Sequence, residues 1–580
     1  MASPGSAPSA SSTAASCIKA TADPILRNAL RYTISAREYA LLHRYVLSRS
    51  RVLKKRVPSV ETVQRVYNPS RPGTNKGKGK DTATAPDDTP AGAVGGDDYN
   101  ARAIRHSVRV FVATAAVTKL WDIVSRRLMA KKQDASTTQK NRPLTQSPTL
   151  RLSLSLSTIL LLYRILFRFL TRLRSHLLDS SALPFRLRNP RISSTLTSPY
   201  APAVGASLAG LALGIYPAQQ LRVSIAIYAA FRALEFGYNA VEDSGALWGW
   251  EKGPGGKLVR SARPAWWGSW ILQPFAMGQL LHAVVFDRDC FPMPFGDFIF
   301  NNSSAYIHAK PADFPSTLKW PGTYDIVDSL AQMARLHWPP FISPTLFPTK
   351  EDAIPLSLSS ISPLASGAHP LIASLSCATL HPSDPSCSRT ALTFWLRSFP
   401  PLTRLALLVY SALLLPRFTR FYHFPVSTLN SLITRALRTS TFVTGSISTI
   451  WASLCFFQTW FPRSFLPTQR FFLSGFLAGF WAWVERKSGR GVFIYTARAS
   501  VDSLWKVGVK RRWWRAMKGG DVWLFVLALM VTGVVYERDA RAVREGDWRK
   551  GVSWVRGEGW RDWGIEDDGE EEEDEGEKED

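Results

Sequence analysis

The tripeptide Leu208-Ala209-Gly210 begins a series of short motifs that returns in the same order from Leu477-Ala478-Gly479 onward. The first copy continues with Ile227-Tyr228, Arg232, Glu235, Trp266-Trp267 and Val284-Val285-Phe286-Asp287-Arg288-Asp289, and the second with Ile494-Tyr495, Arg498, Asp502, Trp513-Trp514 and Val534-Val535-Tyr536-Glu537-Arg538-Asp539. Such a repeat of apolar segments is a common plan of polytopic membrane proteins. The sequence therefore predicts an all-α, polytopic helical membrane protein with an internal duplication of a three-to-four-helix module and disordered termini.

Composition favours a membrane protein over a soluble one. The chain has 21 Trp and 31 Phe and a mean hydropathy of −0.06. The aromatic residues gather where apolar segments end, as expected at a bilayer interface, although a soluble core rich in Trp is the alternative. The formal net charge is +26, and Lys and Arg flank the apolar runs. This pattern predicts anionic lipid as a partner, and no nucleic acid, since no docking motif is recognisable.

The apolar runs and the segments between them predict the organisation of the chain. The expected parts are a disordered stretch at 1–22, a basic amphipathic region at 23–67, a flexible linker at 68–98, a first membrane module at 99–290, a Pro- and aromatic-rich loop region at 291–400, a second membrane module at 401–540, and a charged disordered tail at 541–580. The prolines of 291–400 argue against long regular structure, so this region is expected to be a large exposed loop with short helices. Residues 566–580 hold twelve acidic groups and one Lys, which predicts a segment that can bind cationic protein partners.

Two glycine pairs share the same place in the repeat. Gly210 and Gly214 in the first copy, and Gly475 and Gly479 in the second, have the spacing that lets two membrane helices approach closely. A chance match within an apolar run is the alternative. We expect these positions to pack helices within the chain.

Charged residues also recur within the repeat. Arg232 with Glu235, and Arg498 with Asp502, are spaced to share one helix face. An unpaired charge in hydrocarbon is costly, so these pairs are candidate intramembrane ion pairs that line a polar path, unless both lie at helix ends in water.

The apolar segment 150–170 carries two basic residues of its own. Arg164 and Arg168 lie inside it. A central Arg costs about 2.5–3.5 kcal/mol on insertion scales. The segment is therefore expected to lie at the interface or to extend its Arg side chains out of the bilayer.

Cys377, His381 and Cys387 form a C-x3-H-x5-C cluster that is compatible with zinc but lacks a fourth ligand. The alternative is an ordinary Ser/Pro-rich loop, and we expect no metal and no other cofactor. The sequence has no nucleophile elbow, P-loop or metalloprotease motif. It therefore predicts no enzyme and no catalytic residues.

Part of the chain resembles the transmembrane protein 135 family. The residues that carry this resemblance are Val484-Glu485-Arg486-Lys487-Ser488-Gly489-Arg490-Gly491, then Ile494-Tyr495 and Gly520-Asp521-Val522-Trp523-Leu524-Phe525, together with His381-Pro382-Ser383 and Ser386-Cys387. The resemblance covers about 377–540 most specifically. The first repeat looks like the other half of that family, with the two halves in the opposite order along the chain.

The resemblance implies a multi-pass protein of the peroxisomal membrane or, alternatively, the mitochondrial membrane. Its expected function is a non-enzymatic, pore-like or scaffold role in lipid or metabolite handling. A membrane-embedded lipid-modifying enzyme and an organelle tethering protein are the alternatives. Homo-oligomers are also possible for such a protein. Ion pairs inside the bilayer would favour the pore, and their absence from it would favour the scaffold.

Overall fold

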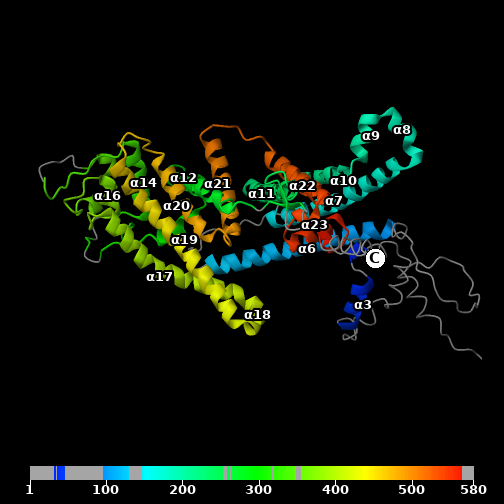
Figure 1. The fold of residues 1–580 in the computed structure, drawn as a ribbon, viewed down its shortest axis with the longest axis horizontal. Helices are drawn as coiled ribbons and strands as arrows, with labels where there is room; N and C mark the ends of the chain where they lie inside the picture. Colours follow the sequence, from blue (N-terminus) through cyan, green and yellow to red (C-terminus); the bar gives the residue numbers. More distant parts are fainter. Residues whose placement is uncertain are drawn as a thin grey trace, which may run out of the picture. The chain divides into compact units, whose positions relative to one another are not determined.

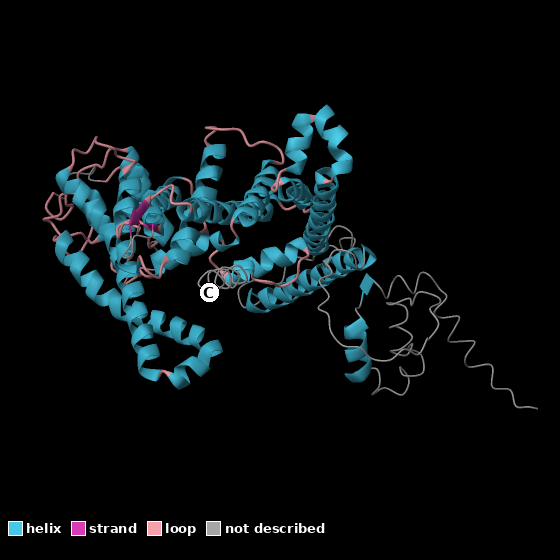
Figure 2. Cartoon of the chain, turned by 45° about the vertical axis from the view of Figure 1, so that its right-hand side comes forward, coloured by secondary structure: helices cyan, strands magenta, loops and turns pink. Residues whose placement is uncertain are grey.

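The computed structural model describes residues 32–33, 36–45, 96–129, 147–252, 258–261, 263–311, 314–315, 319–347 and 354–564. The expected stretch 1–22, most of 23–67 and 68–98, and the acidic end of the chain lie outside these residues. The described part is mostly helical, with one two-stranded sheet (Figures 1 and 2). The chain divides into two compact units, Met1–Leu247 with Gly519–Asp580, and Trp248–Lys518. We call them unit 1 and unit 2.

Unit 1 contains two long helices followed by shorter ones and a C-terminal pair. Its elements are α3 (Ala36–Tyr45), α6 (Gly96–Met129), α7 (Pro148–Leu178), η3 (Ser180–Ala182), α8 (Leu183–Arg188), α9 (Pro190–Thr197), α10 (Ala201–Ala206), η4 (Ser207–Ile215), α11 (Gln219–Asp243), α22 (Gly520–Arg538), η10 (Ala540–Ala542) and α23 (Gly546–Arg556). Helix α7 packs against α6, α10 and η4, and α22 packs against α11 and η4. A helix from the end of the chain therefore completes the unit.

Unit 2 contains the sheet and the remaining helices. Its elements are β1 (Trp250–Lys252), β2 (Leu258–Arg260), η5 (Ser269–Ile271), α12 (Leu272–Phe286), η6 (Arg288–Cys290), α13 (Met293–Asn301), α14 (Thr323–Arg335), η7 (Leu356–Ile361), α15 (Ser362–Ala365), α16 (Leu375–Leu380), α17 (Cys387–Leu414), η8 (Leu415–Arg417), α18 (Phe418–His423), α19 (Pro425–Trp460), α20 (Arg470–Gly479), η9 (Phe480–Glu485) and α21 (Arg490–Lys510). The strands are antiparallel, with Glu251 opposite Val259. Helix α12 packs against α20 and α21, and α19 packs against α17 and α20.

Within the described residues, three helices are long and apolar enough to cross a membrane. They are α7, α19 and α22, and the pair α9 and α10–η4, bent by 85°, makes a fourth if it is one span. Helix α22 illustrates why such a helix forms, because its apolar run is bounded by Asp521 in the first turn and Arg538 in the last. These charges suit the two ends of the helix dipole. These helices are compatible with a membrane protein.

The region 291–400 is not the exposed loop that its prolines predict. Its helix α14 buries Ile326, Leu330 and Met333, and these join the main hydrophobic core of unit 2 together with residues of α12 and α19. Proline restricts long helices but not burial, and short helices with apolar faces pack well between the turns. The expected short helices are present, whereas the expected exposure is wrong for the described part of this region.

The segment after α22 is not a wholly disordered tail either. Residues 541–564 are described, and α23 buries Ser553 and Arg556. Trp548, Val552 and Trp563 pack against a cluster that includes Phe236 of α11. The aromatic residues among the charges provide apolar area that a charge count overlooks. The expected disordered tail at 541–580 therefore has an ordered first part.

Arg164 of α7 is satisfied inside unit 1. Its side chain is buried, donates hydrogen bonds to the backbone carbonyls of Trp554 and Val555, and lies 4.8 Å from the Trp554 ring. Arg168 lies over the ring of Tyr99 at 4.2 Å. Segments distant in the sequence therefore supply the partners, which the sequence of α7 alone does not reveal.

Candidate metal centre

Three cysteines and one histidine of unit 2 converge on one point. Their ligand atoms, from Cys377, His381, Cys387 and Cys455, all lie within 4.8 Å of one another. The Sγ atoms of Cys377 and Cys387 are 3.9 Å apart. His381 Nε2 lies 3.4 Å from the Sγ atoms of both Cys387 and Cys455. This group, which we call the Cys3His cluster, could hold a metal ion.

The cluster is assembled from three elements. Cys377 lies in α16, and His381 directly follows the last residue of that helix. Cys387 is the first residue of α17, whose N-cap is Ser386. Cys455 comes from α19, and it is buried together with Cys377 and His381. The turn between α16 and α17 thus places two ligands opposite a helix that begins much later in the chain.

Hydrogen bonds fix this turn. The Asp384 carboxylate accepts two hydrogen bonds from Arg389, each of 2.7 Å, and one from the backbone N–H of Ser386 at 2.9 Å. The hydrogen bonds from Arg389 are the main cause that lowers the pKa of Asp384 to about 2. At neutral pH the carboxylate therefore stays charged and keeps the turn in place.

The imidazole of His381 is oriented by its other nitrogen. Nδ1 lies 2.7 Å from the backbone carbonyl of Asp384. Because a carbonyl only accepts hydrogen bonds, Nδ1 carries the proton. The lone pair of the neutral ring is then on Nε2, which faces the thiols. This arrangement is the usual outer support of a metal-binding histidine.

The electrostatics of the cluster favour the thiolate at Cys387. Hydrogen bonds with Cys377, Cys455 and His381 lower the pKa of the Cys387 thiol. Burial lowers the pKa of His381, but its hydrogen bonds to Cys377 and Cys387 outweigh this effect and raise it to about 10, so without a metal ion Nε2 also carries a proton at neutral pH. Thiolate is the form of cysteine that binds metals, and a cation that binds here displaces the protons.

The structure brings together the three residues of the C-x3-H-x5-C pattern. It adds Cys455, which the sequence does not connect to them because it lies in an apolar helix with no ligand spacing around it. Pro382 lies two residues after the end of α16, and its carbonyl accepts a hydrogen bond from the backbone N–H of His369. In the sequence, the one indication of this fourth ligand is that Cys455 is a cysteine within an apolar helical segment.

The other residues that carry the resemblance, from Glu485 to Gly491, lie at and around the turn between η9 and α21. Glu485 is buried and accepts a hydrogen bond from Ser488 Oγ at 2.7 Å. The Arg486 guanidinium lies 3.7 Å from the Trp483 ring centroid. Lys487 is exposed. Gly491 has open space where a Cβ would be. The contacts described for this turn join residues of the turn to one another.

The predicted glycines occupy different surroundings. A Cβ on Gly475 would lie 2.4 Å from the carbonyl oxygen of Met277, and a Cβ on Gly479 would lie 2.3 Å from the Cα of Pro274. In unit 1, a Cβ on Gly210 would lie 3.2 Å from the Cα of Val526.

Gly214 is less tightly packed than the other three. A Cβ there would meet only a methyl group of Val522, at 3.8 Å. The structure therefore places Gly210, Gly475 and Gly479 at close helix contacts, whereas Gly214 has room for a small side chain.

The predicted ion pairs lie on α11 and α21. Arg232 and Glu235 are 3.0 Å apart, and Arg232 is also 3.3 Å from Glu545. Asp502 forms an ion pair with Lys506 at 2.6 Å, and Arg498 lies over the ring of its neighbour on α21, Tyr495. Neither α11 nor α21 is among the candidate membrane spans.

The fold defines a mostly α-helical protein with helices able to span a membrane and a Cys3His cluster in its second unit. No family model, curated protein or solved structure matches the chain.

Proposed function

We propose that this chain is a non-enzymatic, multi-pass membrane scaffold of the peroxisome or, as the alternative, the mitochondrion. The observation that carries the scaffold role is that ion pairs connect helices within each unit. In unit 1, Arg222 of α11 binds Asp521 of α22 at 2.7 Å. In unit 2, Arg511, directly after α21, binds Asp287, directly after α12, at 2.6 Å. These charges hold helices together.

The order of elements supports a duplication in which the two copies exchange their last helix. Both units have two long helices (α6 and α7, α17 and α19), a helix that runs into a 3₁₀ helix (α10–η4, α20–η9), and a further helix (α11, α21). The fifth helix comes from the other copy in each case. Unit 1 takes α22, which follows α21 in the chain, and unit 2 takes α12, which follows α11.

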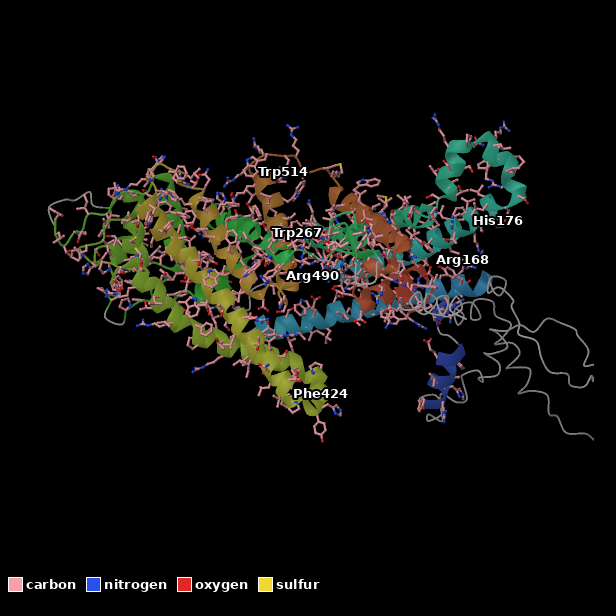
Figure 3. The ribbon with its side chains drawn as sticks, in the orientation of Figure 1. Arg168, His176, Trp267, Phe424, Arg490 and Trp514 are labelled. Carbon is pink, nitrogen blue, oxygen red and sulfur yellow. The ribbon has the colours of Figure 1, made fainter. Side chains whose placement is uncertain are left out.

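The sites where the chain passes between the units support the same proposal. The first passage lies between Leu247 and Trp248, and the second between Lys518 and Gly519. Both fall in the basic, tryptophan-rich loops that correspond in the sequence repeat, which carry Trp267 and Trp514 (Figure 3). Two copies that pass between the units in corresponding loops are expected if one ancestral module exchanged its last helix after duplication.

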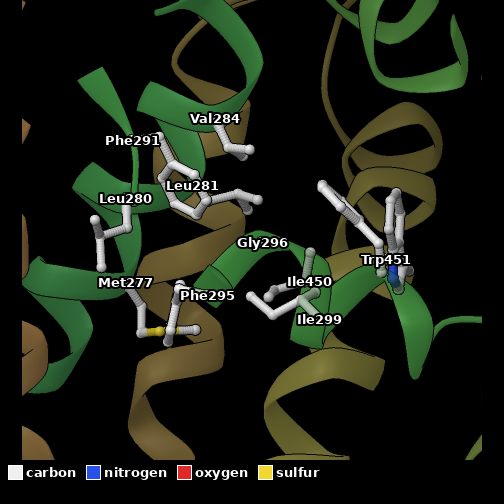
Figure 4. Close-up of a pocket in the computed structure, with 11 residues that line it drawn as sticks. Met277, Leu280, Leu281, Val284, Phe291, Phe295, Gly296, Ile299, Ile450 and Trp451 are labelled. Atoms are coloured by element: carbon white, nitrogen blue, oxygen red, sulfur yellow. The ribbon is translucent and has the colours of Figure 1, made fainter. Parts of the chain in front are cut away.

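One enclosed cavity of unit 2 is too small to pass a transported molecule, which supports a scaffold. Figure 4 shows a cavity between α12, α13 and α19, lined by apolar side chains such as Leu281, Phe295 and Trp451. Its volume is about 20 Å³. That is room for about one water molecule, and too little for a lipid chain or a metabolite. The side chains around it make a packed core.

A flux assay tests the scaffold against the pore. The purified chain would be reconstituted into anionic vesicles that hold a small fluorescent solute. A scaffold leaves the rate of solute release unchanged relative to vesicles with no protein, while a known pore-forming peptide serves as positive control. Release in proportion to the amount of reconstituted protein would contradict the scaffold. Microscopy of the tagged chain against peroxisomal and mitochondrial markers tests the organelle.

A charge-swap cycle tests the exchange. Arg222→Asp alone and Asp521→Arg alone each place two like charges together in a largely buried site, whose side chains are 17% and 7% exposed. The double variant restores an opposite pair, so protein level and apparent Tm should recover. The same cycle at Asp287 and Arg511 tests unit 2. If neither double variant recovers relative to its single variants, the exchanged arrangement is wrong.

A further inference from the structure

Three of the six distances between ligand atoms in the Cys3His cluster match the edges of a tetrahedral zinc site, and all six are at most 4.8 Å. Zn–S bonds of about 2.3 Å and Zn–N bonds of about 2.0–2.1 Å imply S···S edges of about 3.8 Å and S···N edges of about 3.6 Å. The Sγ atoms of Cys377 and Cys387 are 3.9 Å apart, and His381 Nε2 is 3.4 Å from the Sγ of Cys387 and of Cys455. These distances agree with those edges to within about 0.2 Å.

We propose that Cys377, His381, Cys387 and Cys455 bind one Zn²⁺ ion. Three thiolates and one imidazole are a common ligand set of structural zinc sites. The pattern seen in the sequence lacked a fourth ligand, and α19 supplies it. The inference replaces the expectation of a loop without metal.

The orientation of His381 supports the proposal independently of the distances. The carbonyl of Asp384 holds a proton on Nδ1, so that Nε2 is the nitrogen that faces the cysteines and can bind a metal ion when its own proton is displaced. Arg389 in turn holds the Asp384 side chain. One thiol would be enough to satisfy Nε2 by a hydrogen bond, whereas two Sγ atoms lie 3.4 Å from it.

Burial indicates a structural rather than a catalytic ion. Cys377, His381 and Cys455 have exposed fractions of 7%, 2% and 2%. Four protein ligands complete a tetrahedron and leave no position for water or substrate. The ion would therefore act through the fold, by holding the turn between α16 and α17 against α19.

The position of the site explains what the ion stabilises. The region before α17 is rich in proline and consists of short helices, so it has few long elements of its own. A zinc ion that binds both this region and α19 couples its order to that of a candidate membrane span. Because the binding free energy of a structural zinc ion adds to the free energy of folding, removal of the ion should loosen unit 2.

Metal analysis of the purified full-length chain tests the proposal. The chain would be isolated in detergent with a non-chelating affinity tag, and its zinc and iron contents measured by inductively coupled plasma mass spectrometry. We expect about one zinc per chain. Cys455→Ser should lose most of it. Cys290→Ser is the matched control, since Cys290 is also a buried free cysteine of unit 2 but lies outside the cluster.

A second measurement applies if Cys455→Ser fails to fold. Wild-type protein expressed with cobalt in place of zinc should show the thiolate-to-cobalt charge-transfer bands and the intense visible bands of a tetrahedral site. Chelation of the ion should lower the apparent Tm of the wild-type chain and of Cys290→Ser alike.

Three results would overturn the proposal. They are wild-type protein with no more zinc than Cys455→Ser, iron in place of zinc, and an intact mass lower by two hydrogens that maps to a Cys377–Cys387 disulfide. None of them bears on the flux assay, so the scaffold role and the zinc site fail separately.

Discussion

The crossing of α20 over α12 provides a quantitative test of the fold. Gly475→Ala adds a Cβ that would lie 2.4 Å from the carbonyl oxygen of Met277 and 2.8 Å from the Cα of Gly278. Both neighbours are backbone atoms, so no side chain can rotate away, and the two helices must move apart. Overpacking of this kind costs about 1–3 kcal/mol.

Gly491→Ala is the matched control because nothing lies within 4 Å of the added Cβ. This position is the second residue of α21, where alanine favours the helix by a few tenths to about 1 kcal/mol. The two substitutions are chemically identical, so the difference between them isolates the helix contact. The helix preference of alanine is common to both substitutions, so we expect Gly475→Ala to be less stable than Gly491→Ala by about 1–3 kcal/mol.

The assay is thermal unfolding in detergent, followed by the intrinsic fluorescence of the 21 Trp residues. For a unit of this size, about 1 kcal/mol changes Tm by about 2–4 °C, so Gly475→Ala should melt about 2–12 °C below Gly491→Ala. The accessibility of Cys290 to a thiol reagent during heating reports on unit 2 specifically. Equal melting temperatures for the two variants would refute the close crossing of α20 and α12.

Three further predictions concern charge. Arg164→Ala removes the side chain that donates hydrogen bonds to two backbone carbonyls of α23, and it should lower the stability of unit 1 by about 2–4 kcal/mol in thermal unfolding. The control is Arg172→Ala on the exposed side of α7, which should change the stability by less than about 0.5 kcal/mol. Burial, followed by the charge of Arg164, lowers the pKa of His106 from 6.5 to about 4. Unfolding therefore takes up a proton in this range, so the free energy of unfolding should decrease as the pH is lowered from about 6.5 to about 4, and should decrease less in His106→Gln. Cysteines at positions 256 and 518, in the corresponding basic loops, should react with an impermeant maleimide from the same side of the membrane, and reaction from opposite sides would exclude a parallel repeat.

The sequence predicts the helical class and several element positions because these depend on local patterns. The spacing of Gly475 and Gly479 indicates α20, and the apolar runs between basic flanks indicate that the chain forms helices able to enter a membrane. These features need only the residues of the element itself.

The remaining features depend on which segments meet, and local patterns do not encode that. Cys455 looks like one more apolar residue of α19 until α16 lies against it. Arg164 looks too costly for its helix until α23 supplies two carbonyls. The core of unit 2 draws on 291–400 for the same reason, because its short apolar faces gain their partners only in the folded chain.

The composition of the two units has a consequence for the order in which they can form. Unit 2 contains only residues from Trp248 to Lys518, so every helix that it needs has been synthesised once α21 is complete. Unit 1 cannot bury the faces of α11 and η4 until α22 follows, because α22 is the helix that packs against both. Arg222 of α11 likewise cannot form its ion pair until Asp521 of α22 has been synthesised. The first part of the chain to be made is therefore the last to be completed, and α22 and α23 decide whether unit 1 folds.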